Sequence, residues 1–338
     1  MLLVGGAEIM VRGAAEIANR FGIPPLIIGL TVVAFGTSAP EMAVAIKSAF
    51  AGQADIALGN VVGSNILNIL LILGLASMIT PLIVGSRIVQ IDVPILVVIS
   101  VALFAFSFDG QISFLDGAIL FAGSIIYTVY AIFSAHKTDA GAPQDRHPGL
   151  SFLLVIVGLA MLVFGADLLV TSAVSIARWL GVSELLIGLT VISIGTSLPE
   201  IATTVVAALR GLRDMAVGNV VGSCLFNIMA VTGAAAVFSP TGLAVVPALI
   251  RFDMPVMLAA TIACLPIFAT GHLIARWEGF LFFLFYLAYT TYLITASHAQ
   301  ESVELMHKAM LSFVIPLTFL TLCLLWLREI RKKNKTDQ

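Results

Sequence analysis

A short polar motif occurs twice in this chain, each time inside a strongly apolar stretch. "FGTSAPE" covers residues 35–41 and "IGTSLPE" covers residues 194–200. Because proline has no N–H and displaces the carbonyl four residues back, each motif should break a helix and leave backbone carbonyls, hydroxyls and one glutamate together. Such oxygens are the ligands of hard cations such as Ca²⁺, whereas zinc and copper sites use His or Cys. The motif therefore indicates a hard-cation site.

Each predicted break joins two half-helices. The first half would end with free carbonyls at residues 34–37, and the second would begin with Ser38 as its cap, Pro40 in its first turn and Glu41 close behind. An ionisable residue at membrane depth is costly, so Glu41 and Glu200 are the strongest functional candidates. The second copy supplies the matching residues Ser193, Gly195, Thr196, Ser197, Pro199 and Glu200.

A second polar motif follows each break. "GNVVGSNILN" covers residues 59–68 and "GNVVGSCLFN" covers residues 218–227. On a helix, positions four apart share a face, so the Asn and Ser residues form one polar stripe in each copy. Such residues often only join helices, but beside the carboxylates they favour ion ligands, and the glycines allow helices to approach closely. The stripes are Asn60, Ser64 and Asn68, and Asn219, Ser223 and Asn227; the glycines are Gly59, Gly63, Gly218 and Gly222.

The composition predicts an all-α polytopic membrane protein. Of the 338 residues, 60% are apolar and 11% are charged, and the mean hydropathy is +1.09. A bilayer core of about 30 Å needs roughly 20 apolar residues per helix. Eleven segments of that kind are predicted, at residues 1–21, 24–51, 55–79, 88–108, 113–135, 150–180, 184–210, 214–239, 247–270, 273–298 and 309–327.

The chain is internally duplicated. Glu41 and Glu200 lie 159 residues apart, and the same offset aligns the glycines around them without a gap. Each unit spans five predicted helices, and an odd number forces the two copies into opposite orientations across the bilayer. The predicted organisation is a first repeat at 1–135, a cytoplasmic loop at 136–149, a second repeat at 150–298, and an extra transmembrane helix with a basic tail at 299–338.

The Lys and Arg residues set the predicted orientation, because they concentrate on one side of the membrane. They place the N-terminus outside and the C-terminus in the cytoplasm, in the plasma (inner) membrane. No stretch offers a nucleic-acid surface or a soluble regulatory domain. Asp92 and Asp253 precede prolines and are predicted helix caps. The three cysteines, Cys224, Cys264 and Cys323, are predicted packing residues.

Paired "GTS-PE" and "GN-x-x-GS-x-x-x-N" motifs on inverted five-helix repeats resemble the cation/calcium exchanger superfamily, specifically the prokaryotic sodium/calcium exchangers. The resemblance covers roughly residues 1–298. It implies a central Ca²⁺ site formed by Glu41, Glu200 and the backbone carbonyls of Thr37 and Thr196. It also implies flanking Na⁺ sites from Ser38, Ser197, Ser64 and Ser223, the carbonyls of Ala34 and Ser193, and Asn68 and Asn227.

This chain departs from the family pattern at a few positions. Cys224 stands where the family often has Asn, and some members carry Asp at one of the positions of Asn68 and Asn227. Two asparagines leave two carboxylates in the cage, which disfavours potassium co-transport. The eleventh segment has no counterpart among the family's ten core helices.

The leading hypothesis is secondary antiport of Na⁺ and Ca²⁺ by alternating access, with both ions as substrates, no cofactor and no enzymatic activity. Proton/calcium exchange is the alternative, although the corresponding motif there usually reads "GN" where this chain has "GTS". An intramembrane serine protease at Ser38 or Ser197 would lack a membrane-embedded base. A purely structural role would leave two buried acids unexplained.

Overall fold

The computed structural model describes residues 1–135, 148–181 and 193–296, and within them nearly all regular structure is helical. The predicted segment 309–327, Cys323 and most of the loop 136–149 lie outside these ranges. The first part contains α1 (Leu2–Phe21), α2 (Pro25–Ile28), η1 (Gly29–Val33), α3 (Ala34–Thr37), α4 (Ala39–Phe50), α5 (Ala54–Ile66), η2 (Leu67–Leu73), α6 (Gly74–Ile79), β1 (Leu82–Ile83), η3 (Ile88–Asp92), α7 (Val93–Phe106), η4 (Ser107–Asp109), β2 (Gln111–Ile112) and α8 (Phe114–Phe133).

The second part repeats this order after α9 (Pro148–Trp179). It contains α11 (Ser193–Thr196), α12 (Leu198–Leu209), α13 (Arg213–Phe226), η6 (Asn227–Val231), α14 (Thr232–Phe238), β3 (Leu243–Ala244), η7 (Leu249–Asp253), α15 (Met254–Ala269), β4 (Leu273–Ile274) and α16 (Arg276–Ala296). Apart from η4, a 3₁₀ turn, the η elements are π-helical turns within longer helices.

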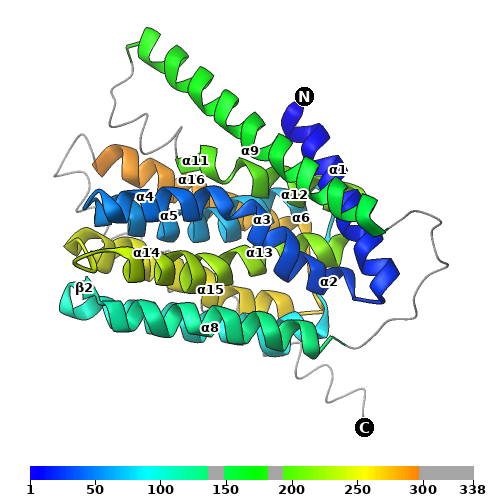
Figure 1. Ribbon diagram of the computed structural model, residues 1–338, viewed down its shortest axis with the longest axis horizontal. Helices are drawn as coiled ribbons and strands as arrows, with labels where there is room; N and C mark the ends of the chain where they lie inside the picture. Colours follow the sequence, from blue (N-terminus) through cyan, green and yellow to red (C-terminus); the bar gives the residue numbers. More distant parts are fainter. Residues whose placement is uncertain (136–147, 182–192, 297–338) are drawn as a thin grey trace.

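Six helices in the described ranges are long and apolar enough to cross a membrane, and the bent pair Pro25–Thr37 and Ala39–Phe50 makes a seventh. Figure 1 shows α1 and α9 side by side, crossing the other helices obliquely. The two pack through small residues: a Cβ on Gly6 would lie 2.8 Å from the carbonyl oxygen of Gly158. The remaining helices pack as a bundle around α5 and α13, most of whose residues are buried.

Two short antiparallel ladders connect loops from the two parts of the chain. Strand β1 pairs with β4, and β2 pairs with β3. Each ladder therefore joins a loop of residues 1–135 to a loop of residues 193–296, so the two halves are interlocked through their loops as well as through their helices.

Glycines bring α13 close to the first broken helix. A Cβ on Gly218 would lie 2.7 Å from the carbonyl oxygen of Leu26, and one on Gly222 would lie 2.6 Å from that of Leu30. The predicted close approach is confirmed at both positions. At Gly59 a Cβ would meet no atom of the described residues within 4 Å, so no close approach is found there.

The prediction that Asp92 and Asp253 cap helices was also wrong. The backbone at each residue is already helical, since a π-helical turn leads directly into the next helix, and neither side chain caps it. Asp92 instead accepts a hydrogen bond of 3.0 Å from the hydroxyl of Tyr127, and Asp253 accepts one of 2.8 Å from Tyr289. These carboxylates join neighbouring helices.

Asp92 also pairs with Arg87, whose Nε lies 3.5 Å from Asp92 Oδ2. Because Asp92 is fully buried, the variant Arg87→Met should leave an uncompensated charge and lower the free energy of unfolding by about 3–5 kcal/mol. Replacing both residues, with Asp92→Asn, should recover most of that loss. The measurement is thermal unfolding in detergent, with Arg251→Met at an exposed arginine as the control. Equal effects of the Arg87 and Arg251 variants would contradict a stabilising ion pair between Arg87 and Asp92.

Candidate functional site

Both duplicated motifs break a helix. In the first copy α3 ends at Thr37, Ser38 forms a turn, and α4 begins at Ala39 with a bend of 45°. In the second copy α11 ends at Thr196 and α12 begins after Ser197. Ser38 and Ser197 have nearly the same backbone angles, φ −83°, ψ 6° and φ −89°, ψ 7°. The prolines therefore produce the same break twice.

The two serines occupy the cap position, but the prediction that they cap the following half-helix was wrong. Neither side chain makes a cap hydrogen bond. The hydroxyl of Ser38 donates to Oε1 of Glu200 over 3.1 Å, and the hydroxyl of Ser197 donates to Oε1 of Glu41, also over 3.1 Å. A carboxylate is the stronger acceptor for a buried hydroxyl. The serine at each break therefore donates a hydrogen bond to the glutamate of the other break.

The polar stripes on α5 and α13 complete the cluster. The Ser197 hydroxyl is 3.3 Å from the hydroxyl of Ser64, and the Thr37 hydroxyl is 3.5 Å from that of Ser223. The hydroxyls of Thr37 and Thr196 donate to the side-chain oxygens of Asn219 and Asn60, each over 3.4 Å. The threonine–asparagine contacts of the two halves match, whereas the contact to the α5 or α13 serine comes from Ser197 in one half and from Thr37 in the other.

Several buried oxygens in the cluster have no hydrogen-bond partner among the described residues. They include Oε2 of Glu41 and Oε2 of Glu200, and for Asn68 and Asn227 neither the oxygen nor the nitrogen of the side chain is paired. All four side chains are at most 1% exposed. Buried polar groups are almost always paired, so these unpaired oxygens need a ligand to satisfy them.

The backbone carbonyl of Ala34 differs from the prediction. It was expected to be free, yet it accepts the N–H of Ser38 at 3.0 Å and the hydroxyl of Thr37 at 3.3 Å. Ser193, whose carbonyl was predicted as its counterpart, is the first residue of α11. The break therefore leaves fewer free carbonyls than proline chemistry alone suggests, because a following N–H and a side chain satisfy this one.

Two threonines join the cluster without an obvious sequence signal. Asn219 Nδ2 donates to Thr203 Oγ1 at 3.1 Å and to Thr204 Oγ1 at 2.9 Å. Adjacent threonines in an apolar helix are commonly satisfied by their own backbone. Their position about one turn after Glu200 was the only available hint.

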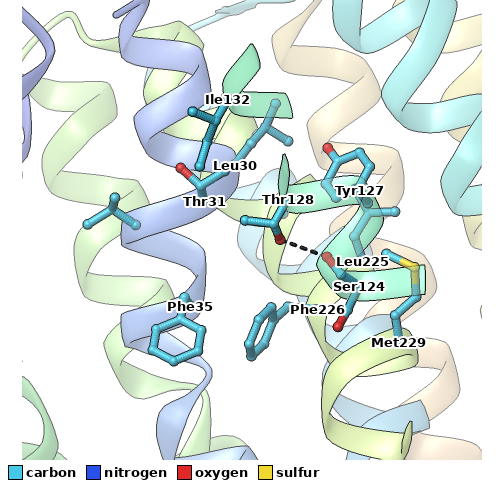
Figure 2. Close-up of a pocket in the computed structure, with 12 residues that line it drawn as sticks. Leu30, Thr31, Phe35, Ser124, Tyr127, Thr128, Ile132, Leu225, Phe226 and Met229 are labelled. Carbon is cyan, nitrogen blue, oxygen red and sulfur yellow. Dashed lines mark hydrogen bonds between the residues drawn. The ribbon is translucent and has the colours of Figure 1, made fainter. Parts of the chain in front are cut away.

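A cavity of about 290 Å³ lies beside the first broken helix, between η1, α8 and α13. Figure 2 shows Phe35 and Phe226 at one end of it and hydroxyl groups of α8 along its wall. Those hydroxyls bond to carbonyls of their own helix: Ser124 to Phe121 and Thr128 to Ser124. The lining offers no charged group and no unsatisfied oxygen, so this cavity is not the cation site.

The chemistry of the cluster follows from its composition. The described residues hold no group of three or more His, Cys, Asp or Glu side chains suited to a metal ion. The cluster instead combines two carboxylates with serine, threonine and asparagine oxygens. Such a donor set suits hard cations rather than zinc or copper.

Comparisons with known proteins agree with a cation site. The family model described as "Sodium/calcium exchanger protein" matches residues 1–133 and 150–295. The chain is 38% identical to the putative antiporter CaxA of Alkalimonas amylolytica over 275 residues, which are 78% of this chain and 86% of that protein. It is 31% identical to the sodium/calcium exchanger MaX1 of Methanosarcina acetivorans over 322 residues, covering 82% and 91%.

A solved structure of the sodium-calcium exchanger NCX_Mj matches the fold with a TM-score of 0.76 and 31% identity, covering 88% of this chain and 95% of that one. The family match spans nearly all of the described residues, and the relatives are covered over most of their length. The chain is a multi-pass membrane protein and belongs to the sodium/calcium exchanger family of antiporters.

Proposed function

We propose that this protein is a secondary antiporter that exchanges Na⁺ for Ca²⁺ by alternating access. The observation that carries the proposal is the crosswise pair of buried glutamates. Oε1 of Glu41 and Oε1 of Glu200 each accept a hydrogen bond from the serine of the other break, and neither Oε2 has a partner among the described residues. Two carboxylates that contact opposite halves of the chain can share one divalent ion.

The central site would hold Ca²⁺ as substrate, bound by Glu41, Glu200 and the backbone carbonyls of Thr37 and Thr196. Ca²⁺ takes about 6–8 oxygen ligands. Two carboxylates and two carbonyls supply most of that number, and neighbouring hydroxyls or water can complete it. The full burial of both acids supports this role, since the charge of the ion compensates theirs.

The Na⁺ sites would flank the central site. The hydroxyls of Ser38 and Ser197 donate their protons to the glutamates, which leaves their lone pairs available for a cation. A role for the Ala34 carbonyl requires that Thr37 or Ser38 release it first. The remaining proposed ligands are Ser64, Ser223, Asn68, Asn227 and the carbonyl of Ser193.

The two halves, residues 1–135 and 150–298, would be inverted repeats, with residues 136–149 as a cytoplasmic loop and the N-terminus outside. The ladders support this. Strands β1 and β3 occupy matching places in the two halves, as do β2 and β4, so the pairing of β1 with β4 is the counterpart of the pairing of β3 with β2. The segment 299–338 would add one helix and a cytoplasmic tail.

Alternating access would involve α1 and α9 moving across the bundle. These helices lie obliquely over it and pack on each other through glycines. Arg210, directly after α12, donates from Nε to Oε2 of Glu8 on α1 over 2.8 Å. Because α12 carries Glu200, this contact links the moving helices to the site.

The counter-ion is tested in vesicles containing the purified protein. Sodium-loaded vesicles should take up ⁴⁵Ca²⁺ when external sodium is removed, and a sodium ionophore should abolish the uptake. A pH gradient imposed without sodium should drive none. Calcium uptake that follows the pH gradient and ignores sodium would instead establish proton/calcium exchange.

A further inference from the structure

The side-chain amide of Asn219 is held by hydrogen bonds on both sides. Its nitrogen donates to the hydroxyls of Thr203 and Thr204 on α12. Its oxygen lies 3.4 Å from the hydroxyl of Thr37 at the first break and shares that proton with the carbonyl of Ala34, at 3.3 Å. All four side chains are at most 1% exposed. The amide therefore bridges α12, which carries Glu200, and the break that precedes Glu41.

The orientation of this amide follows from the proton count of Thr203. The single hydroxyl proton of Thr203 is directed at the carbonyls of Pro199 and Glu200, at 2.7 Å and 3.2 Å. Toward Asn219 the same oxygen can only accept, so the amide must present its NH₂ group there. Its oxygen must then face Thr37, and the reversed orientation would place two acceptors together.

The matching position in the first half lacks this support. Asn60 corresponds to Asn219 at the offset of 159 residues, and Val44 and Ala45 stand where the second half has Thr203 and Thr204. Neither side chain can accept a hydrogen bond. Asn60 Nδ2 accordingly has no partner among the described residues, although its oxygen accepts from Thr196.

We propose that Thr203 and Thr204 are positioning residues for the ion site, and that they make its two sides unequal. They fix the Asn219 amide, which holds Thr37 and with it the Thr37 carbonyl that the proposed function assigns to Ca²⁺. The Thr37 side is pre-organised, while the Thr196 side adjusts when an ion binds. This inference rests on the proposed function. It adds Thr203 and Thr204, which would act on the site without contacting an ion.

Pre-organisation lowers the free energy cost of arranging ligands around an ion, so its loss should weaken binding more than it slows transport. In Thr203→Val/Thr204→Val, two groups of similar shape replace the hydroxyls. The KM for Ca²⁺ should rise about tenfold, which corresponds to about 1.4 kcal/mol. The maximal rate should stay within about twofold, because the proposed ion ligands themselves remain.

The experiment measures sodium-driven ⁴⁵Ca²⁺ uptake against calcium concentration in vesicles. Thr203→Ser/Thr204→Ser keeps both hydroxyls and should restore the wild-type KM. Thr261→Val is the matched control, since Thr261 is also buried and bonds to a carbonyl of its own helix, Met257, at 2.8 Å. Thr261→Val should change neither the KM for Ca²⁺ nor the maximal rate.

An unchanged KM in the double valine variant would overturn the inference, as would an equal change in Thr261→Val or a serine variant that fails to restore the KM. Wild-type vesicles in the same assay test the proposed function separately. Absent uptake by the wild type contradicts sodium/calcium exchange itself, whereas normal wild-type uptake with an unaltered double variant contradicts only the role of the threonines.

Discussion

Glu41→Gln and Glu200→Gln should each reduce sodium-dependent Ca²⁺ uptake by at least about 100-fold. Glutamine keeps the shape of glutamate but removes one of two negative charges from a fully buried site. Two unit charges 4 Å apart interact by about 4 kcal/mol at an effective dielectric constant of 20, and the double charge of calcium enlarges the loss. Since about 1.4 kcal/mol is a factor of ten in affinity, 100-fold is a conservative expectation.

The measurement is initial ⁴⁵Ca²⁺ uptake into sodium-loaded vesicles with matched amounts of protein. Asp55→Asn serves as the control, because it removes a carboxylate from an exposed first turn of α5. The melting temperature in calcium-free detergent should not fall in either Gln variant, which excludes unfolding as the cause. Wild-type uptake by either variant would refute the central site.

Gly218→Ala should destabilise the protein by about 1–3 kcal/mol and impair exchange, whereas Gly59→Ala should do neither. The added methyl group at 218 would lie 2.7 Å from the carbonyl oxygen of Leu26, so α13 must move away from α2. Asn219 is the next residue and would move with it. At Gly59 the same methyl group meets no atom of the described residues within 4 Å, and alanine is the better helix former.

The two variants form a matched pair, because they change the same residue of the repeated "GNVVGS" motif. Thermal unfolding in detergent and calcium uptake should both separate them. If Gly59→Ala is as harmful as Gly218→Ala, the contact with Leu26 is not what requires Gly218, since helix propensity alone favours alanine at both positions.

The sequence predicted the breaks because their cause is local. Pro40 and Pro199 remove a hydrogen bond within their own turn, and no tertiary contact can replace it. The repeat also predicted that Glu41 and Glu200 have equivalent surroundings. The pairs Ser38–Glu200 and Ser197–Glu41 have that equivalence in the structure, although only their geometry revealed which atoms meet.

The errors arose where a distant partner competes with a local one. Ser38 stands at a cap position, yet its hydroxyl donates its hydrogen bond to a carboxylate from α12. Asp92 precedes a proline as caps often do, but η3 already continues the helix and Tyr127 supplies the partner. Gly59 and Gly218 are identical in sequence context, but within the described residues only Gly218 has close neighbours. None of these choices is encoded within a few residues of the site.

The crossed serine–glutamate bonds also have an evolutionary consequence. Neither half of the chain can satisfy its own acid, because the hydroxyl that each carboxylate accepts comes from the other half. A half-length ancestor would have been incomplete as a single molecule and would have needed a second copy to supply the missing hydroxyls. Joining two such copies in one chain would remove the dependence of their association on concentration and would let them diverge, as Val44 and Thr203 do.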